Sequence, residues 1–218
     1  TMYTKNKDIK FAIFFNSTRG LVVFTKVSKK FPTDIYLALK NLNPEILKYL
    51  KDKKIKYTLI KKINLQLIKK ITNKNYELLI SAGFPLIFPE DLINSSRLGT
   101  INLHAGKLPA YKGGSPLNWQ IINGEKNIGI SIMRMNKKLD DGDIYSSKIF
   151  KLKKNDTIKT VHDKVNSYFP KMTMKVIDNI YSGIKPIAQK KTGARTYRQR
   201  SEVDGLIDWK KKRCKSSI

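Results

Sequence analysis

The stretch INLHAGKLPAYKGGSPLNWQIINGE, residues 101–125, decides the fold and places a site in it. Its apolar opening is typical of a strand, and on a strand Asn102 and His104 project from the same face. A glycine-containing loop follows, and His104 is one of only two histidines in 218 residues. A histidine that only fills a core does not need this polar setting. We therefore expect His104 to carry chemistry.

The sequence before this stretch alternates strands and helices. Apolar runs predict strands over 9–15, 33–40, 55–61 and 76–83, and helices over 43–54 and 65–73. Asn43 is a typical helix cap, with Pro44 at the first helical position. This order predicts right-handed crossovers in an α/β, Rossmann-like, mostly parallel sheet with helices on both faces. NSTRG follows the first strand instead of Gly-x-Gly-x-x-Gly, so a dinucleotide cofactor is not expected.

The sequence after residue 113 predicts four further elements. A helix is expected over 115–124, and a half-buried alternating strand over 128–135 that pairs with 143–152. A long helix is expected over 155–183, capped by Asn155 or Asp156 and kinked at Pro170. We predict one catalytic domain over 1–185 and a short C-terminal appendage over 186–218.

The net charge of +27 invites a nucleic-acid reading. Only seven of the 44 basic residues are arginine, and the lysines are spread along the chain, so solvated lysine faces are the favoured interpretation. A non-enzymatic binder of nucleic acid or of an anionic surface stays open as an alternative. It predicts basic residues interleaved with exposed aromatic residues on one face.

The chain shows few features that depend on a membrane or on an oxidising compartment. No segment reaches the roughly 18 apolar residues that cross a bilayer. The opening residues predict a core strand rather than a signal peptide. The single Cys214 allows neither a disulfide framework nor a cysteine metal site. We expect a cytoplasmic protein that does not insert into a membrane.

A third polar residue completes the candidate site. Asp140 lies in KKLDDGDIY, residues 137–145, a carboxylate-rich turn around Gly142 that follows the alternating strand over 128–135. Sites of open parallel sheets lie at the carboxyl ends of the strands, so such a turn can return an acid to the imidazole of His104.

NLHAGKLPAYKGG and LDDGD together resemble the folate-dependent formyltransferases. That family carries Asn-x-His on a strand, a Leu-Pro-x-Tyr-(Arg/Lys)-Gly loop and a later Leu-Asp-x-Gly loop. The resemblance is close over residues 76–150, and in the N-terminal part it is one of pattern only. It implies the formyltransferase fold, a 10-formyltetrahydrofolate donor, an amine acceptor and no metal. It also implies Asn102, His104 and Asp140 as the catalytic residues.

These three residue types suit formyl transfer. Negative charge develops on the formyl oxygen, and the amide of Asn102 is a neutral donor for it. His104 can take a proton from the attacking amine near neutral pH. Asp140 is expected to orient the imidazole and to raise its pKa.

The donor pocket is expected beside these residues. By resemblance, the loop SAGFPLIFPE (81–90) and the Asp140–Asp143 turn hold the pterin. The candidate cofactor-binding residues are Gly83, Phe84, Leu86, Ile87, Asp141 and Asp143. Exposed backbone groups would pair with the pterin edge and apolar side chains would cover its face. The alternative is that this loop only fills the core below the sheet.

Three branches of the family compete for the acceptor. Glycinamide ribonucleotide transformylases carry a glycine-rich loop after the first strand and Gly-Gly-Pro in the catalytic loop, which this chain lacks. Methionyl-tRNA formyltransferases share DDGD and the late EVDGLIDW, but they carry a C-terminal β-barrel that KKKRCKSSI cannot form. Nucleotide-sugar N-formyltransferases, which modify a nucleoside-diphosphate-linked amino-dideoxy sugar for O-antigen, lipopolysaccharide or capsule synthesis, resemble the chain most. The family also makes a homodimer possible.

The acceptor-binding residues are expected in two places. In KKTGARTYRQR, arginine side chains suit pyrophosphate oxygens and a tyrosine ring can stack on a base. The glycine loop adds lysine charge near the sugar. The candidates are Lys107, Tyr111, Lys112, Gly113, Arg195, Tyr197 and Arg198. A solvated basic turn is the alternative for the arginine group.

Overall fold

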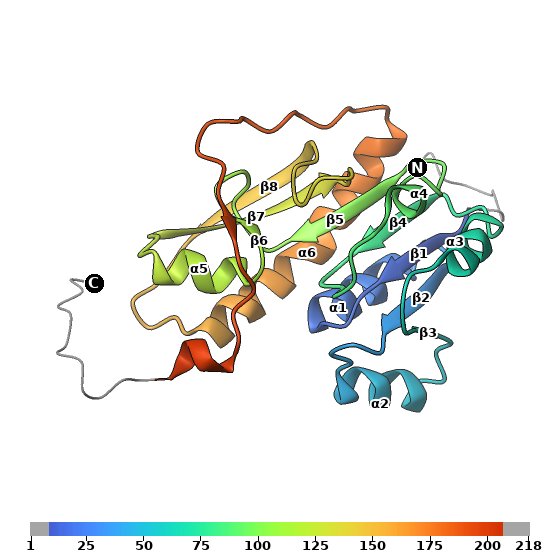
Figure 1. The fold of residues 1–218 in the computed structure, drawn as a ribbon, viewed down its shortest axis with the longest axis horizontal. Coiled ribbons are helices and arrows are strands. Elements are labelled where there is room, and N and C mark those ends of the chain that lie inside the picture. Colours follow the sequence, from blue (N-terminus) through green and yellow to red (C-terminus); the bar gives the residue numbers. More distant parts are fainter. Residues whose placement is uncertain (1–8, 207–218) are drawn as a thin grey trace.

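A seven-stranded sheet forms the centre of the molecule, and the computed structural model describes residues 9–206 of the chain (Figure 1). The strand order is β3-β2-β1-β4-β5-β7-β8. The first five of these are parallel, whereas β7 pairs antiparallel with β5 and β8 pairs antiparallel with β7. The predicted mostly parallel sheet is confirmed. The strands are β1 (Phe11–Phe14), β2 (Thr33–Ala38), β3 (Thr58–Ile60), β4 (Leu78–Ser81), β5 (Thr100–His104), β7 (Asn127–Arg134) and β8 (Ile144–Lys151).

Helices cover both faces of the sheet, as the alternation of side chains along β1 shows. Phe11 and Ile13 pack in a core with the buried residues of α1 (Thr18–Val27), α2 (Pro44–Asp52), α5 (Pro116–Ile122) and α6 (Ile158–Tyr181). Ala12 and Phe14 pack on the other face with α3 (Leu65–Thr72) and α4 (Glu90–Ile93). Successive residues of a strand point to opposite faces, so each face of β1 supplies one core.

Three of the predicted details are wrong. A helix, α1, follows β1 where none was expected, and it begins within NSTRG. The strand β7 is buried on both faces, because Ile128, Ile130 and Ile132 enter the core with α6 whereas Ser131, on the opposite side, donates to the carbonyl of Gly106. The cap of α6 is Thr157, because its hydroxyl accepts from the third residue of the helix.

The segment after α6 is not a separate body. We call residues 184–206 the strap, because this segment runs along the molecule from the end of α6 past the loops after β5 and β7 (Figure 1). Its strand β9 (Thr196–Tyr197) pairs in parallel with β6 (Lys112–Gly113), and η1 (Glu202–Gly205) follows. Trp209 and Cys214 lie outside the described residues.

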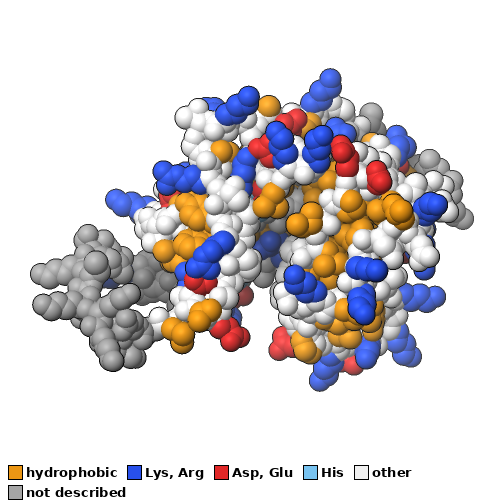
Figure 2. Space-filling model, in the orientation of Figure 1, with side chains coloured by type: hydrophobic (Ala, Val, Ile, Leu, Met, Phe, Trp, Pro, Cys, Tyr) orange, Lys and Arg blue, Asp and Glu red, His pale blue; other side chains and the backbone are white. Residues whose placement is uncertain are grey.

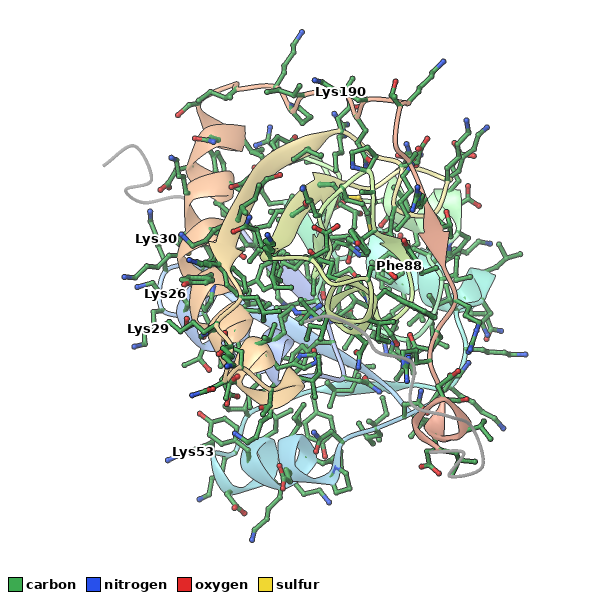
Figure 3. The ribbon with its side chains drawn as sticks, turned by 90° about the vertical axis from the view of Figure 1, so that its left-hand side faces the viewer. Lys26, Lys29, Lys30, Lys53, Phe88 and Lys190 are labelled. Carbon is green, nitrogen blue, oxygen red and sulfur yellow. The ribbon has the colours of Figure 1, made fainter. Side chains whose placement is uncertain are left out.

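The basic residues are dispersed over the described surface. Figure 2 shows Lys and Arg side chains scattered among apolar and polar groups on the viewed face. Lys26, Lys29, Lys53 and Lys190 project away from the ribbon (Figure 3). No helix within residues 9–206 has the length and the apolar composition that a bilayer crossing needs.

Candidate active site

A cleft lies at the carboxyl ends of the parallel strands, where open sheets of this kind hold their ligands. Its volume is about 740 Å³, within the range of small-molecule pockets. Asn16 after β1, Asn41 after β2, Ser81 at the end of β4 and His104 at the end of β5 contribute to its walls. Figure 2 shows the molecule hollowed between the part that carries α5 and the part that carries α1 and α2.

The structure brings Asn102, His104 and Asp140 together in this cleft. The amide Nδ2 of Asn102 lies 3.4 Å from Oδ1 of Asp140, and Nδ1 of His104 lies 3.5 Å from Oδ2. The backbone N–H of Gly113 donates to the same Oδ2 at 2.8 Å. His104 and Asp140 are only 6% and 7% exposed, so their interaction is little screened by water.

Local sequence explains how each group arrives. On β5, Ile101 and Leu103 enter the core with α6, which leaves Asn102 and His104 on the cleft side. Asp140 follows β7 in a left-handed backbone conformation, with φ of 47°. Gly142 lets this turn close, because a Cβ there would lie 1.6 Å from the carbonyl oxygen of Arg134.

The hydrogen bonds of His104 fix where its proton sits. Nε2 lies 2.6 Å from the carbonyl oxygen of Tyr111. A carbonyl oxygen only accepts, so the neutral ring donates from Nε2 and keeps a lone pair on Nδ1, beside Asp140.

The pKa of His104 is lowered, mainly because burial disfavours the charged ring. Asp140 and the Tyr111 carbonyl raise it, and the charge of Arg19 lowers it further. Asp140 acts on this pKa in the expected direction, but burial is the larger effect. The ring is therefore neutral at pH 7 and can accept a proton.

Arg19 and His162 line the cleft, although the sequence did not predict either as a site residue. Arg19, in the first turn of α1, lines the cleft, donates from Nη1 to the carbonyl of Leu103 at 3.2 Å and lies over the ring of Phe169. Burial lowers the pKa of Arg19 to about 10. His162 of α6, interpreted from the sequence as a surface or packing residue, also lines the cleft. The position of Arg19 after the carboxyl end of β1 was the one available signal.

The residues expected to hold the donor lie in two adjoining cavities. Gly83, Phe84, Leu86 and Ile87 all line the cleft. Asp141 and Asp143 instead line a neighbouring cavity of about 470 Å³. Residues 135–138 line both cavities and join them.

Of the residues expected to bind the acceptor, Gly113 lines the cleft. Lys112 forms an ion pair with Asp141, so each of the two charges already has a partner. The hydroxyl of Tyr111 donates to Glu125 at 2.7 Å. Lys107 packs its Cβ against Gly129 on β7. These three side chains lie outside the lining of the cleft and support its walls.

The arginine group also lies outside the lining of the cleft. Tyr197 stacks on Tyr111 and on Trp119, with ring centroids 5.2 and 5.3 Å apart. Arg198 pairs with Asp204. The carbonyl of Arg195 accepts from Lys112 N at 2.9 Å. In this structure Arg195 and Tyr197 join the strap to the loop after β5, whereas Arg198 forms its ion pair within the strap.

The strap also holds the turn of Asp140, a feature that the sequence did not reveal. Nε2 of Gln189 donates to the carbonyl oxygens of Asp140 and Gly142 at 2.9 and 2.7 Å. Gln199 lines the cleft, and the backbone N–H of Arg200 donates to Ser115 Oγ at 3.1 Å. Across residues 9–206, no three His, Cys, Asp or Glu side chains gather as a metal site would need.

Comparison with known proteins gives a family match over most of the chain. The model of the formyl transferase family matches residues 15–177. A methionyl-tRNA formyltransferase from Staphylococcus epidermidis is 38% identical over 137 residues, which are 61% of this chain and 43% of that protein. The match therefore spans less than half of the length of that relative.

Solved structures of similar fold cover more of the chain. A sugar N-formyltransferase from Shewanella is 24% identical, covers 87% of this chain and 76% of its own, and gives a TM-score of 0.72. An N-formyltransferase from Helicobacter canadensis, in complex with folinic acid and dTDP-3-aminofucose, is 18% identical with a TM-score of 0.72. It covers 93% of this chain and 76% of its own. At these identities the similarity is one of fold.

Proposed function

This chain belongs to the formyl transferase family, and from that premise we propose that it formylates the primary amine of a nucleoside-diphosphate-linked amino-dideoxy sugar. The donor is 10-formyltetrahydrofolate. One observation carries the proposal: the two carboxylate oxygens of Asp140 face the amide of Asn102 and the imidazole of His104 inside an open cleft.

The cleft suits the donor. Phe84, Leu86, Ile87 and Met135 line it with apolar groups that can cover a flat ring. Phe84 is itself held edge-on against Phe14 and Phe88, with ring centroids 5.6 and 5.8 Å away. The folate, when bound, supplies the formyl carbon. The Helicobacter canadensis relative, which holds folinic acid, supports the assignment.

His104 acts as the base in this proposal. Its Nδ1 accepts the proton that the acceptor amine releases as the new C–N bond forms, and it returns that proton to the departing folate nitrogen. Asp140 stabilises the imidazolium between the two transfers, because its carboxylate lies 3.5 Å from Nδ1. The Tyr111 carbonyl keeps the ring oriented throughout.

Asn102 donates to the formyl oxygen. Its Nδ2 carries two hydrogens, and the long contact of 3.4 Å with Asp140 leaves one of them free to point into the cleft. A fixed neutral donor in a little-hydrated site stabilises the negative charge that develops there, without reorganisation during the reaction.

Two observations bear on the acceptor. Similar folds that cover 87% and 93% of this chain belong to a sugar N-formyltransferase and to one bound to dTDP-3-aminofucose. These support a nucleotide-linked amino sugar, and with it a role in O-antigen or capsule precursor synthesis. The 38% identity to a methionyl-tRNA formyltransferase supports methionyl-tRNA as the second candidate.

A transfer assay tests both candidates. The protein is incubated with 10-formyltetrahydrofolate and, separately, with dTDP-, UDP- and GDP-linked amino sugars, glycinamide ribonucleotide and methionyl-tRNA. Mass spectrometry then measures the gain of one formyl group, with Asp140→Asn as the control for adventitious formylation. Formylation of a nucleotide sugar is the expected result. Formylation of methionyl-tRNA alone selects the second candidate, and no formylation of any amine overturns the proposal.

A further inference from the structure

Arg19 is a cation without an acidic partner in the wall of the cleft. In the part of the chain that the structure describes, no carboxylate forms an ion pair with it, and its buried Nε–H has no hydrogen-bond partner. Burial alone accounts for the lowering of its pKa, to about 10, so the guanidinium stays charged at neutral pH. A charge in this position costs free energy unless an anion compensates it.

The start of α1 adds a second positive feature at the same place. The helix has ten residues and begins at Thr18. Asn16, which precedes the helix, and Arg19, its second residue, both line the cleft. Ser17, at the N-cap, makes no side-chain cap bond, and its hydroxyl donates to the carbonyl of Ala82 at 3.0 Å. The first turn holds no acidic residue. The positive end of the helix dipole is thus uncompensated, a setting that favours an anion.

The acid of the cleft is already engaged elsewhere. Asp140, the single carboxylate among the described residues that line the cleft, faces His104, Asn102 and the N–H of Gly113. It does not contact Arg19. The cleft therefore has a spare positive charge on the wall that carries α1 and α6, which is the face opposite to the Phe84 and Phe88 cluster.

We propose that Arg19 and the N-terminus of α1 bind an oxyanion of the acceptor, a phosphoryl group of the nucleoside diphosphate. This rests on the proposed function for the identity of the acceptor. Nη1 of Arg19 is bonded to the carbonyl of Leu103, the residue before His104, so the anion would lie close to the base. In a nucleotide sugar the pyrophosphate is attached to the anomeric carbon, which one sugar ring separates from the amine. In methionyl-tRNA an ester and a ribose separate the amine from the nearest phosphate.

A carboxylate of the folate tail is the other anion that could reach this subsite. The position of Arg19 argues for the acceptor, because Phe84 and Leu86, the apolar side chains expected to cover the pterin, pack on the other face of the sheet. Phe84 packs there with Phe14 and Phe88. Arg19 instead lies over Phe169 of α6.

Binding measurements without catalysis test the subsite. Isothermal titration measures the affinity of dTDP, UDP, GDP and inorganic pyrophosphate for the wild type, Arg19→Lys and Arg19→Met. The control is Lys26→Met, which removes the same charge from the exposed end of the same helix. We expect Arg19→Met to lower the affinity for the nucleotide that the wild type binds most tightly by about tenfold or more. Arg19→Lys should weaken it less, and Lys26→Met should leave it unchanged.

Three results overturn the subsite: no nucleotide or pyrophosphate binding by the wild type, equal binding by wild type and Arg19→Met, or an equal loss in Lys26→Met. Titration with 5-formyltetrahydrofolate separates the two anion sources. If Arg19→Met loses affinity for the folate alone, Arg19 binds a carboxylate of the donor, and the assignment of the subsite to the acceptor is overturned. A loss of nucleotide affinity in a protein that formylates no amine supports the subsite while the proposed function fails. Circular dichroism confirms that each variant is folded.

Discussion

Nε2 of His104 donates to the carbonyl oxygen of Tyr111 at 2.6 Å, and this contact determines which nitrogen of the ring is left to accept a proton. The nitrogen that remains, Nδ1, lies 3.5 Å from Oδ2 of Asp140. A proton that arrives on Nδ1 therefore forms an ion pair as it binds. The arrangement couples proton acceptance by His104 to electrostatic stabilisation by Asp140.

The first prediction concerns the pH dependence of the reaction. Burial lowers the pKa of His104 from its ordinary value of 6.5, so the base stays neutral below that pH. We expect the acid limb of kcat/KM to lie below pH 6.5. Asp140→Asn removes a charge that favours the imidazolium, so this limb should move to still lower pH while kcat falls by about 10²–10⁴.

NMR titration checks the same pKa without turnover. The chain has only two histidines, and a His162→Gln variant assigns their ring signals. Arg19→Met should shift the titration of His104 in the opposite direction to Asp140→Asn, towards higher pH, because the charge of Arg19 lowers that pKa. Equal pKa values of His104 in the wild type and in both variants would contradict this electrostatic account.

The second prediction separates a chemical role from a structural one in two asparagines. Asn102→Ala removes the neutral donor from the cleft, so kcat should fall by about 10²–10³ with little change in stability. Asn64→Ala removes the cap of α3, whose Oδ1 accepts from Leu67 N at 2.9 Å. That variant should lose about 1 kcal/mol of unfolding free energy and keep wild-type kcat. Steady-state kinetics and urea denaturation of both proteins provide the check.

Much of the fold and the three central site residues follow from local sequence. Apolar runs of strand length alternate with capped helices, which predicts a parallel sheet, and Asn43 caps α2 as expected. Asn102 and His104 meet because side chains two apart on a strand share a face. Asp140 joins them because its turn, closed at Gly142, follows the neighbouring antiparallel strand β7.

What the sequence did not show depends on contacts between distant segments. The helix α1 contains three valines, two threonines and a phenylalanine, residue types whose intrinsic propensity favours strands. Tertiary packing therefore decides that this segment forms a helix. The pairing of β9 with β6, which places Tyr197 beside the loop after β5, cannot be read from spacing. Arg19 was missed because burial of one arginine leaves no local pattern.

The third prediction concerns the space beside the ring of His104. A Cβ at Gly106 would lie 2.4 Å from Nε2 of His104 and 2.4 Å from the carbonyl oxygen of Tyr111. Gly106→Ala must therefore separate the two partners of the bond that orients the ring. We expect a loss of kcat of about a hundredfold or more, by analogy with other losses of geometry at reacting groups.

Gly205→Ala is the matched control for this substitution. Nothing lies within 4 Å of a Cβ at Gly205, in the strap, so its kcat should stay at the wild-type value. Kinetics should be measured together with the NMR signal of the His104 ring. A Gly106→Ala protein with wild-type kcat would show that the bond to Tyr111 is dispensable.

The fourth prediction tests whether the strap positions the turn of Asp140. Nε2 of Gln189 donates to the carbonyls of Asp140 and Gly142, and Asp140 holds a left-handed backbone conformation that few residues adopt unaided. Gln189→Leu keeps the approximate volume and removes both donors. The turn should then move relative to His104, and kcat should fall by about tenfold while KM for the acceptor changes little.

A purely structural role of Gln189 would lower stability and leave the titration of His104 where it is in the wild type. A positioning role predicts more, because movement of Asp140 away from Nδ1 removes an interaction that raises the pKa of His104. The ring of His104 in Gln189→Leu should therefore titrate at lower pH than in the wild type. Lys190→Leu, the exposed neighbour on the strap, should show neither change. A lower unfolding free energy with wild-type kcat and an unshifted titration of His104 would assign Gln189 to stability alone.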